Sequence, residues 1–185
     1  MTNVLTRRNK SMALYDRFNK GKGGKKPRRK KSELQTWVNK LDRLLSLYVR
    51  MRDSREFNYT HFRCISCGRI LPIDQADLGH FFSRRHMSLR FDTRNCNAEC
   101  KRCNRFDSEH LVGYQRNLIL KLGMLAFKQK HPNEVPNMEE VKVLGKQQID
   151  LMEVEKYQAK KWSVFELQQL YQYYAALIVK MREEM

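Results

Sequence analysis

The chain has 185 residues, a length that suits one domain with appendages, and its 37 Lys and Arg residues outnumber 20 Asp and Glu residues. The resulting net charge of +17 indicates a nucleic acid partner. No apolar run reaches the ~18 residues that span a bilayer, and the N-terminal residues lack a hydrophobic signal segment. We therefore expect a cytoplasmic protein that does not enter a membrane.

Residues 1–31 form the most basic stretch of the sequence. They contain twelve Lys and Arg residues and one acid, Asp16, so +11 of the net +17 lies here. Such a composition cannot bury a core and predicts a disordered basic arm. The arm would attract DNA phosphates through counterion release; a solubilising tail is the alternative. The candidate DNA-binding residues are Lys25, Lys26, Arg28, Arg29, Lys30 and Lys31.

An amphipathic helix is predicted over residues 32–56. Ser32 and Gln35 have the spacing of a capping box. Apolar residues then recur at alternating intervals of three and four, which places them on one face. That face needs a partner, either the domain core or another helix, and a homodimer through the amphipathic helices is one possibility. The residues of this face are Leu34, Trp37, Leu41, Leu44, Tyr48 and Met51.

Two C-x-x-C pairs define the central region. Cys64 and Cys67 form the first pair, and Cys100 and Cys103 form the second. Four thiolates are the set that closes a tetrahedral structural zinc site. An odd number of cysteines, four of them paired in this way, favours metal in a reducing compartment over disulfides. Cys96 is interpreted as a small buried residue, with its proximity to Cys100 leaving it open as an alternative ligand.

The region around these pairs is predicted to contain short strands followed by a helix. Residues 61–63 would form a strand before the first cysteine pair. Residues 77–82 and 89–91 would form an antiparallel pair, and a helix would run from Cys103 to Gly123. The expected fold class is α+β and mostly helical, with a small zinc-clipped ββα core flanked by long amphipathic helices.

Zinc binding would bring the strand that carries His80 close to the start of the helix at Asn104. A neutral imidazole can take a proton from water near pH 7, and an amide oxygen can bind a hard cation such as Mg²⁺. This pairing in a basic protein suggests a site that cuts phosphodiesters. The alternatives are a structural histidine and a helix N-cap. Arg84 and Arg85 follow as phosphate clamps or as a solvated loop.

These motifs resemble the phage lambda NinG (Rap) recombination protein family. The resemblance rests on C-I-S-C-G, D-L-G-H-F, L-R-F-D-T-R-N and C-K-R-C-N, and it covers residues 60–125 well. More broadly, the stretch resembles HNH nucleases with a ββα-metal core. His80, Asn95 and Asn104 stand at the three positions that give this class its name, in the H-N-N form of phage endonuclease VII.

The resemblance implies a metal-dependent endonuclease domain over residues 60–130. His80 would be the general base, Asn95 would brace the loop that holds it, and Asn104 would bind catalytic Mg²⁺ or Mn²⁺. The implied substrate is a branched recombination intermediate such as a Holliday junction or D-loop, in the bacterial host cytoplasm if a phage encodes the protein. The alternative is a non-catalytic, zinc-clipped DNA-binding accessory protein.

The carboxylate ligand of the catalytic ion is less well defined. HNH sites usually carry it directly before the histidine, where this chain has Gly79, whereas the D-x-G-H order of the resembling family implies Asp77. On a flat strand Asp77 and His80 face opposite ways, so this ligand requires a bend. Asp107, three residues after Asn104 on the predicted helix, is the alternative. We interpret His110 as a surface residue.

Residues 131–185 are predicted to be helical support. Asn137 would cap a helix that starts at Met138, and Ser163 with Glu166 forms a second capping box. Residues 145–161 carry no clear pattern. The last helix presents a cluster of tyrosines that could stack on bases, although packing against the first helix is the preferred interpretation. These are Tyr171, Tyr173 and Tyr174.

Overall fold

The computed structural model describes residues 31–185. Most of the predicted arm therefore lies outside the described residues, and so do Lys25, Lys26, Arg28, Arg29 and Lys30. Lys31 is described and exposed. Residues Glu33–Met185 form one compact unit, and the architecture below is that of this unit.

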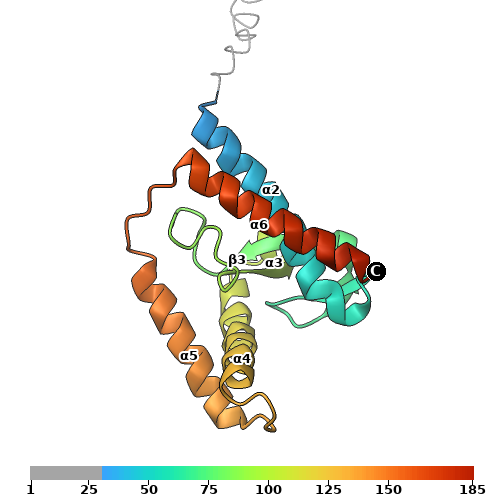
Figure 1. Ribbon diagram of the computed structural model, residues 1–185. Helices are drawn as coiled ribbons and strands as arrows, with labels where there is room; N and C mark the ends of the chain where they lie inside the picture. The colour runs from blue at the N-terminus through green and yellow to red at the C-terminus, as the bar shows by residue number, and fades with distance from the viewer. Residues whose placement is uncertain (1–30) are drawn as a thin grey trace, which may run out of the picture. The chain divides into compact units, whose positions relative to one another are not determined.

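The unit is built from helices and four short strands, which confirms the α+β, mostly helical class. Two 3₁₀ turns, Arg55–Phe57 and Ile73–Gln75, flank the first two strands. No helix within residues 31–185 is both long and apolar enough to cross a membrane. In chain order the elements are α2 (Glu33–Ser54), β1 (His61–Arg63), β2 (Ile70–Pro72), β3 (Ala76–His80), β4 (Cys96–Cys100), α3 (Lys101–Phe106), α4 (His110–Lys130), α5 (Met138–Glu155) and α6 (Val164–Glu183) (Figure 1).

Helices α2 and α6 lie side by side and bury their apolar faces against each other (Figure 1). The rings of Trp37 and Tyr171 meet edge to face, and those of Tyr48 and Tyr174 are 5.0 Å apart. The preferred packing of the last helix on the first is thus confirmed. Both apolar faces find a partner within one chain, and a homodimer stays a prediction. The buried residues of this cluster are Val38, Leu41, Leu45, Val49, Phe91, Cys96, Leu167 and Tyr174.

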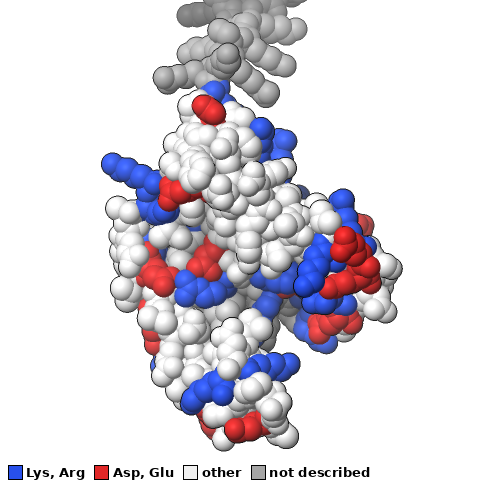
Figure 2. Space-filling model, viewed as in Figure 1, with Lys and Arg blue, Asp and Glu red and all other residues white. Residues whose placement is uncertain are grey.

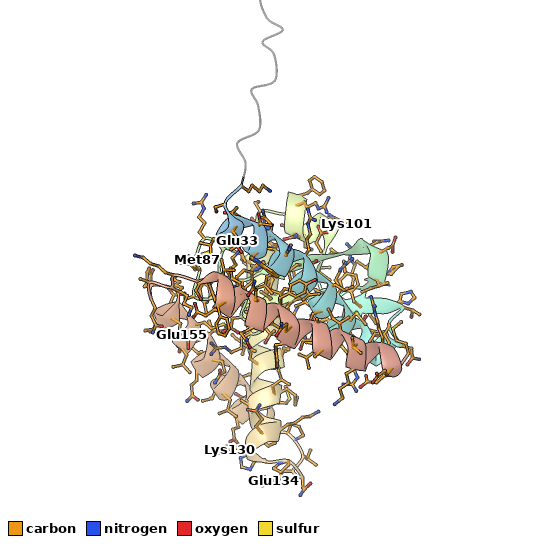
Figure 3. The ribbon with its side chains drawn as sticks, turned by 45° about the horizontal axis from the view of Figure 1, so that its top comes forward. Glu33, Met87, Lys101, Lys130, Glu134 and Glu155 are labelled. Carbon is orange, nitrogen blue, oxygen red and sulfur yellow. The ribbon has the colours of Figure 1, made fainter. Side chains whose placement is uncertain are left out.

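Helices α4 and α5 form a second pair, which is antiparallel, and the tip that connects them lies at Lys130 and Glu134 (Figure 3). The predicted helix end at Gly123 is wrong, because α4 continues to Lys130. Glycine at this position lets the backbones of α4 and α5 approach each other closely. A Cβ at Gly123 would lie 1.9 Å from the Val141 carbonyl oxygen, and a Cβ at Gly145 would lie 1.9 Å from the Ile119 carbonyl oxygen. The unreadable residues 145–161 become the second half of α5 and the link to α6.

The caps of the two C-terminal helices form as predicted. The Asn137 side chain accepts hydrogen bonds from the first turn of α5, which satisfies N–H groups that have no partner inside the helix. Ser163 and Glu166 form the reciprocal capping box that starts α6.

Strand β3 pairs with β4 in an antiparallel register that runs from Ala76 opposite Cys100 to His80 opposite Cys96. The prediction that residues 89–91 pair with this strand is wrong. The apolar residues Leu89 and Phe91 are two positions apart because each packs into a different hydrophobic cluster, and both lie in turns. Every residue of β4 is buried, although its sequence alternates apolar Cys96, Ala98 and Cys100 with polar Asn97 and Glu99.

The helix predicted from Cys103 is divided into α3 and α4. Asp107 leaves the helical conformation (φ −99°, ψ 107°), and its Oδ1 accepts a hydrogen bond from the Glu109 amide. Asp and Asn commonly form such turns, which compete with the helix. Asp107 therefore does not share a helix face with Asn104, so the spacing argument for Asp107 as a metal ligand is wrong.

Candidate functional site

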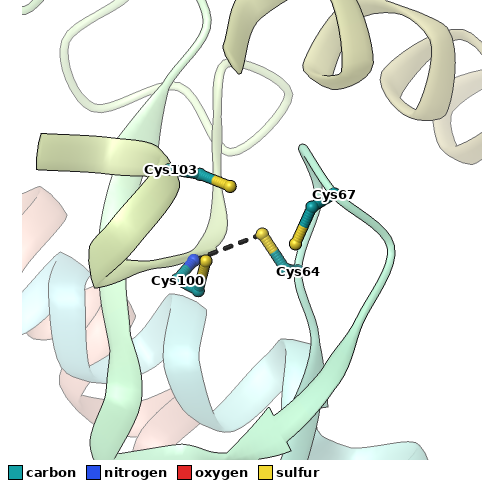
Figure 4. Close-up of side chains that lie close together, drawn as sticks. All are labelled: Cys64, Cys67, Cys100 and Cys103. Atoms are coloured by element: carbon teal, nitrogen blue, oxygen red, sulfur yellow. Dashed lines mark hydrogen bonds between the residues drawn. The ribbon is translucent and has the colours of Figure 1, made fainter. Parts of the chain in front are cut away.

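The four paired cysteines converge on one point (Figure 4). Their sulfur atoms all lie within 4.8 Å of one another, compared with about 3.8 Å in an ideal tetrahedron of zinc–sulfur bonds. Main-chain and side-chain donors complete the cluster: the Cys100 amide donates to Cys64 Sγ (3.3 Å), and Arg69 Nε donates to Cys67 Sγ (3.5 Å). Such donors stabilise thiolates, so the residues fit a structural metal ion such as zinc.

The turn that presents the first pair has one special position, Gly68, with φ at 71°. A left-handed residue there favours glycine. Cys96 lies outside the four-sulfur cluster and is fully buried, with Sγ 3.6 Å from the Arg90 carbonyl oxygen. The interpretation of Cys96 as a small buried residue is confirmed.

Beside the cluster, residues from five segments line an open cleft of about 820 Å³. Its walls include four residues singled out from the sequence: Asp77, His80, Arg84 and Asn104. Arg85 is exposed, and neither Arg85 nor Asp107 lines the cleft. The remaining lining residues are Asp42, Arg43, Ser46 and Arg50 of α2, Leu78 of β3, Ser83 of the following loop, Arg105 of α3 and His110 of α4.

His80 is held by a single well-defined contact, from Nε2 to the Arg90 carbonyl oxygen at 3.1 Å. A carbonyl only accepts, so Nε2 carries the hydrogen and Nδ1 keeps its lone pair. Arg90 is in turn fixed to α2 by two hydrogen bonds to Asp42, at 3.0 and 2.6 Å. Burial lowers the pKa of His80, which keeps the ring neutral near pH 7. A neutral ring with one free nitrogen has the properties of a general base.

Asp77 and Asn104 are neighbours, as a shared ion would require, with 3.4 Å between Asp77 Oδ2 and Asn104 Nδ2. Arg105 donates to both oxygens of Asp77, at 2.6 and 2.9 Å. Partial burial raises the pKa of Asp77, but the hydrogen bonds from Arg105 and Asn104 outweigh it and hold the pKa below its usual value. The carboxylate is therefore ionised at neutral pH.

The pair fits a hard divalent cation on two conditions. Rotating the Asn104 amide would turn its oxygen toward Asp77, and amide orientations are assigned from hydrogen bonding. Arg105 must also move away, and its side chain is 53% exposed, so little packing opposes that movement. In this structure the guanidinium supplies the positive charge that the carboxylate attracts.

Asn95 lies behind the cleft and is completely buried. Its Nδ2 donates to the carbonyl oxygens of Phe82 (2.9 Å) and Leu89 (3.1 Å), and its Oδ1 accepts from the Phe82 amide (2.7 Å). These bonds close the loop between β3 and β4, which carries Arg84 and the Arg90 carbonyl. The position of Asn95 thus suits a loop brace.

Sequence reasoning missed two cleft groups. His110, interpreted as a surface residue, is only 20% exposed, and its Nδ1 lies 2.6 Å from Oε1 of the fully buried Glu99. That interpretation is wrong because the helix break at Asp107 changes the direction in which residue 110 points. Arg105 was not considered at all; its place after Asn104 on a short helix offered no recognisable signal.

The family model and the curated relatives that match this chain carry the same family name. The family model described as Bacteriophage Lambda NinG protein matches residues 6–143. Proteins named "Protein ninG" from Escherichia phage 933W and Escherichia phage lambda are 32% and 31% identical over 98 residues, which is 52% of this chain and 45% of each relative. The Salmonella phage P22 protein is 33% identical over 91 residues, 49% of this chain and 41% of the relative.

Each match spans less than half the length of the curated relative. No solved structure matches the chain. Because the family model covers well over half of the 185 residues, the protein belongs to the phage NinG family.

Proposed function

We propose that this protein is a metal-dependent, HNH-type DNA endonuclease that acts on branched recombination intermediates. The observation that carries the proposal is the hydrogen bond from His80 Nε2 to the Arg90 carbonyl, in a cleft that also holds Asp77 and Asn104. The succession β3, β4, α3 next to a four-cysteine cluster also supports the proposal, because such nucleases are expected to contain a zinc-clipped ββα core.

In the proposed reaction His80 Nδ1 takes a proton from water as the water oxygen attacks phosphorus. The bond between phosphorus and the 3′ oxygen then breaks, leaving a 5′ phosphate and a 3′ hydroxyl. Asp77 and Asn104 would hold a Mg²⁺ or Mn²⁺ ion, which supplies Lewis-acid stabilisation of the charge that develops on the phosphate and the 3′ oxygen. Arg84 and Arg50, which both line the cleft, would hold the flanking phosphates.

DNA affinity would come mainly from residues 1–31. Basic and acidic side chains are interspersed on the face of the described unit seen in Figure 2. The N-terminal segment, by contrast, contributes +11 of the net +17. A dense run of cations suits sequence-independent binding to phosphates. Branched DNA as the substrate, such as a Holliday junction or D-loop, is supported by the family resemblance alone.

A second candidate function is a non-catalytic, zinc-clipped DNA-binding accessory protein of recombination. The observation that favours it is the double hydrogen bond from Arg105 to Asp77, which a permanent structural ion pair would also make. Under this alternative the protein would bind branched DNA and cut none of it with any divalent ion.

The test is a nicking assay on supercoiled plasmid and on a synthetic four-way junction, with and without Mg²⁺ or Mn²⁺. We expect metal-dependent cleavage that falls by ~10²-fold or more in His80→Ala, because removing a general base costs rate. Binding measured by gel shift should change little. The matched control is His61→Ala, since His61 is exposed on β1 and lies outside the cleft. Unchanged cleavage by His80→Ala would exclude His80 as the base.

A further inference from the structure

Glu99 is a carboxylate placed where carboxylates are rarely found. It lies on β4 opposite Asp77 and is completely removed from solvent. Its Oε1 accepts from Ser66 Oγ (2.5 Å) and contacts His110 Nδ1, whereas its Oε2 has no hydrogen-bond partner among residues 31–185. A Cβ at Gly79 would come within 2.4 Å of Oε2, so glycine at this position makes room for the carboxylate. The fold thus makes room for a buried carboxylate, although an apolar side chain would fill the same space.

A buried carboxylate requires partners that replace its lost hydration. Among residues 31–185, the side chains that hydrogen-bond to Glu99 are those of Ser66 and His110, and of these only the imidazole can carry a positive charge. His110 is also the first residue of α4, which places the ring at the start of that helix.

The same contact sets the direction of the His110 ring. The carboxylate takes the hydrogen on Nδ1, so Nε2 is the nitrogen left for other partners. His110 lines the cleft together with His80, Asp77 and Asn104. The two histidines of the cleft thus differ in their hydrogen bonds. His80 has a free lone pair on Nδ1, whereas Nδ1 of His110 donates to the Glu99 carboxylate.

We propose that Glu99 and His110 form a carboxylate–histidine pair in which His110 protonates the departing 3′ oxygen. The inference rests on the proposed function and deepens it by adding a second catalytic residue, with Glu99 as its positioning residue. Sequence spacing gave no indication of either.

The reaction balances as a proton relay through two groups. As the bond between phosphorus and the 3′ oxygen breaks, its electron pair stays on oxygen, and the Nε2 proton of His110 moves to that oxygen. His80 has taken one proton from the attacking water. After product release His110 regains a proton from solvent and His80 loses one, so the pair of histidines returns to its starting state.

His110 shares the cleft with other charged groups, and Glu99 is distinguished from them by its direct contact with the His110 ring. The charged residues that share the cleft with His110 are Asp42, Arg43, Arg50, Asp77, Arg84 and Arg105.

The experiment compares two junction substrates that differ at one atom, with Mn²⁺ present throughout. One has the normal 3′ oxygen at the cleavage site, and the other has sulfur in its place. A thiolate leaves without protonation, so a general acid is dispensable on the sulfur substrate. We expect His110→Ala to lower cleavage of the oxygen substrate by ~10²-fold or more and to cut the sulfur substrate at nearly the wild-type rate. Glu99→Gln should show the same pattern with a smaller loss.

The controls separate this inference from the function on which it rests. His80→Ala should stay impaired on both substrates, because a good leaving group does not replace the base. His110→Gln retains a hydrogen-bond donor toward Glu99, so it serves as the second variant if His110→Ala does not fold. Its cleavage rate should also return to nearly the wild-type rate on the sulfur substrate. Equal impairment on both substrates, or none on either, would overturn the role of His110 while leaving the nuclease intact. Cleavage of neither substrate by the wild-type protein would instead refute the nuclease proposal.

Discussion

Strand β4 is held at two points by two different kinds of chemistry. At its C-terminal end Cys100 belongs to the four-cysteine cluster. At its centre the Ala98 amide donates to Asp53 Oδ2 (2.8 Å), and the Asp53 carboxylate also accepts from Arg52 (2.7 Å) and Lys121 (2.6 Å). The first anchor could bind a structural metal ion. The second is a network of buried charges that joins α2 and α4 to the strand.

The two anchors differ in how far apart their parts lie in the chain. Each cysteine pair spans four residues, and one metal ion could bind both pairs. The charge network joins residues that are 45 and 68 positions from Asp53, and Arg52 adds hydrogen bonds to the carbonyl oxygens of Thr93 and Cys96. Both anchors position β4, and β4 leads directly into α3 and Asn104. The geometry of the cleft therefore depends on both.

The largest expected effect comes from removing the metal anchor. Chelation, or Cys103→Ser, should unfold the region around β3, β4 and α3, because the free energy of binding a structural zinc ion is about 10–16 kcal/mol and is available only to the folded state. Burial also raises the pKa of Cys64 to about 11, so this thiol ionises readily only when a metal displaces its proton. Circular dichroism with chelator, followed by zinc addition, measures the loss and its reversal.

The matched control is Cys96→Ala, since Cys96 is equally buried but lies outside the cluster. This variant should keep one zinc ion per chain by elemental analysis. A wild-type protein with well under one zinc ion per chain would contradict the metal anchor.

A smaller effect is expected from the charge network. Asp53→Asn should destabilise the protein by roughly 3 kcal/mol, because it leaves Arg52 and Lys121 without their buried counter-ion. Denaturant unfolding of the zinc-loaded protein measures this. Glu139→Gln is the control, since its pair with Lys142 is exposed and worth under ~1 kcal/mol. Equal stability of the two variants would mean that the network contributes nothing to holding β4.

The network also gives stability a definite pH dependence. Burial raises the pKa of Asp53, but Arg52 and Lys121 outweigh it and place the folded-state pKa well below its usual value. The stabilisation is therefore complete above the unfolded pKa of ~3.9 and is lost as the pH falls below it. Burial and Arg52 lower the pKa of Lys121 to about 8, so this residue makes stability rise between pH 8 and its unfolded value of ~10.4. Asp53→Asn should lack the acid-side loss.

The two anchors also mark what could be predicted from the sequence. The C-x-x-C pairs, the strand that carries His80 and the capped helices α5 and α6 follow from local spacing, and each was predicted. The approach of His80 and Asn104 to one cleft was predicted from the expectation that a metal ion closes the loop between them.

Features that depend on contacts between residues far apart in the chain could not be predicted from local spacing. The role of Asp53 could not be predicted because its partners are far away in the chain. Strand β4 was missed because its polar residues, Asn97 and Glu99, are buried by partners that lie far away in the chain. His110 was misjudged because the turn at Asp107 interrupts the helical spacing. In each case the tertiary environment decided the outcome, and a single sequence contains little direct information about it.

The central proposal is that the cleft binds a divalent ion between Asp77 and Asn104, next to His80 as the proposed base. A calorimetric titration of the zinc-loaded protein with Mn²⁺ tests it without DNA. We expect one Mn²⁺ per chain, bound ~10-fold or more weakly by Asp77→Asn and by Asn104→Ala, since each removes one ligand oxygen. Asp107→Asn, which alters a carboxylate outside the cleft, should bind as the wild type does. Equal Mn²⁺ affinity in all four proteins, or no binding by the wild type, would contradict the claim.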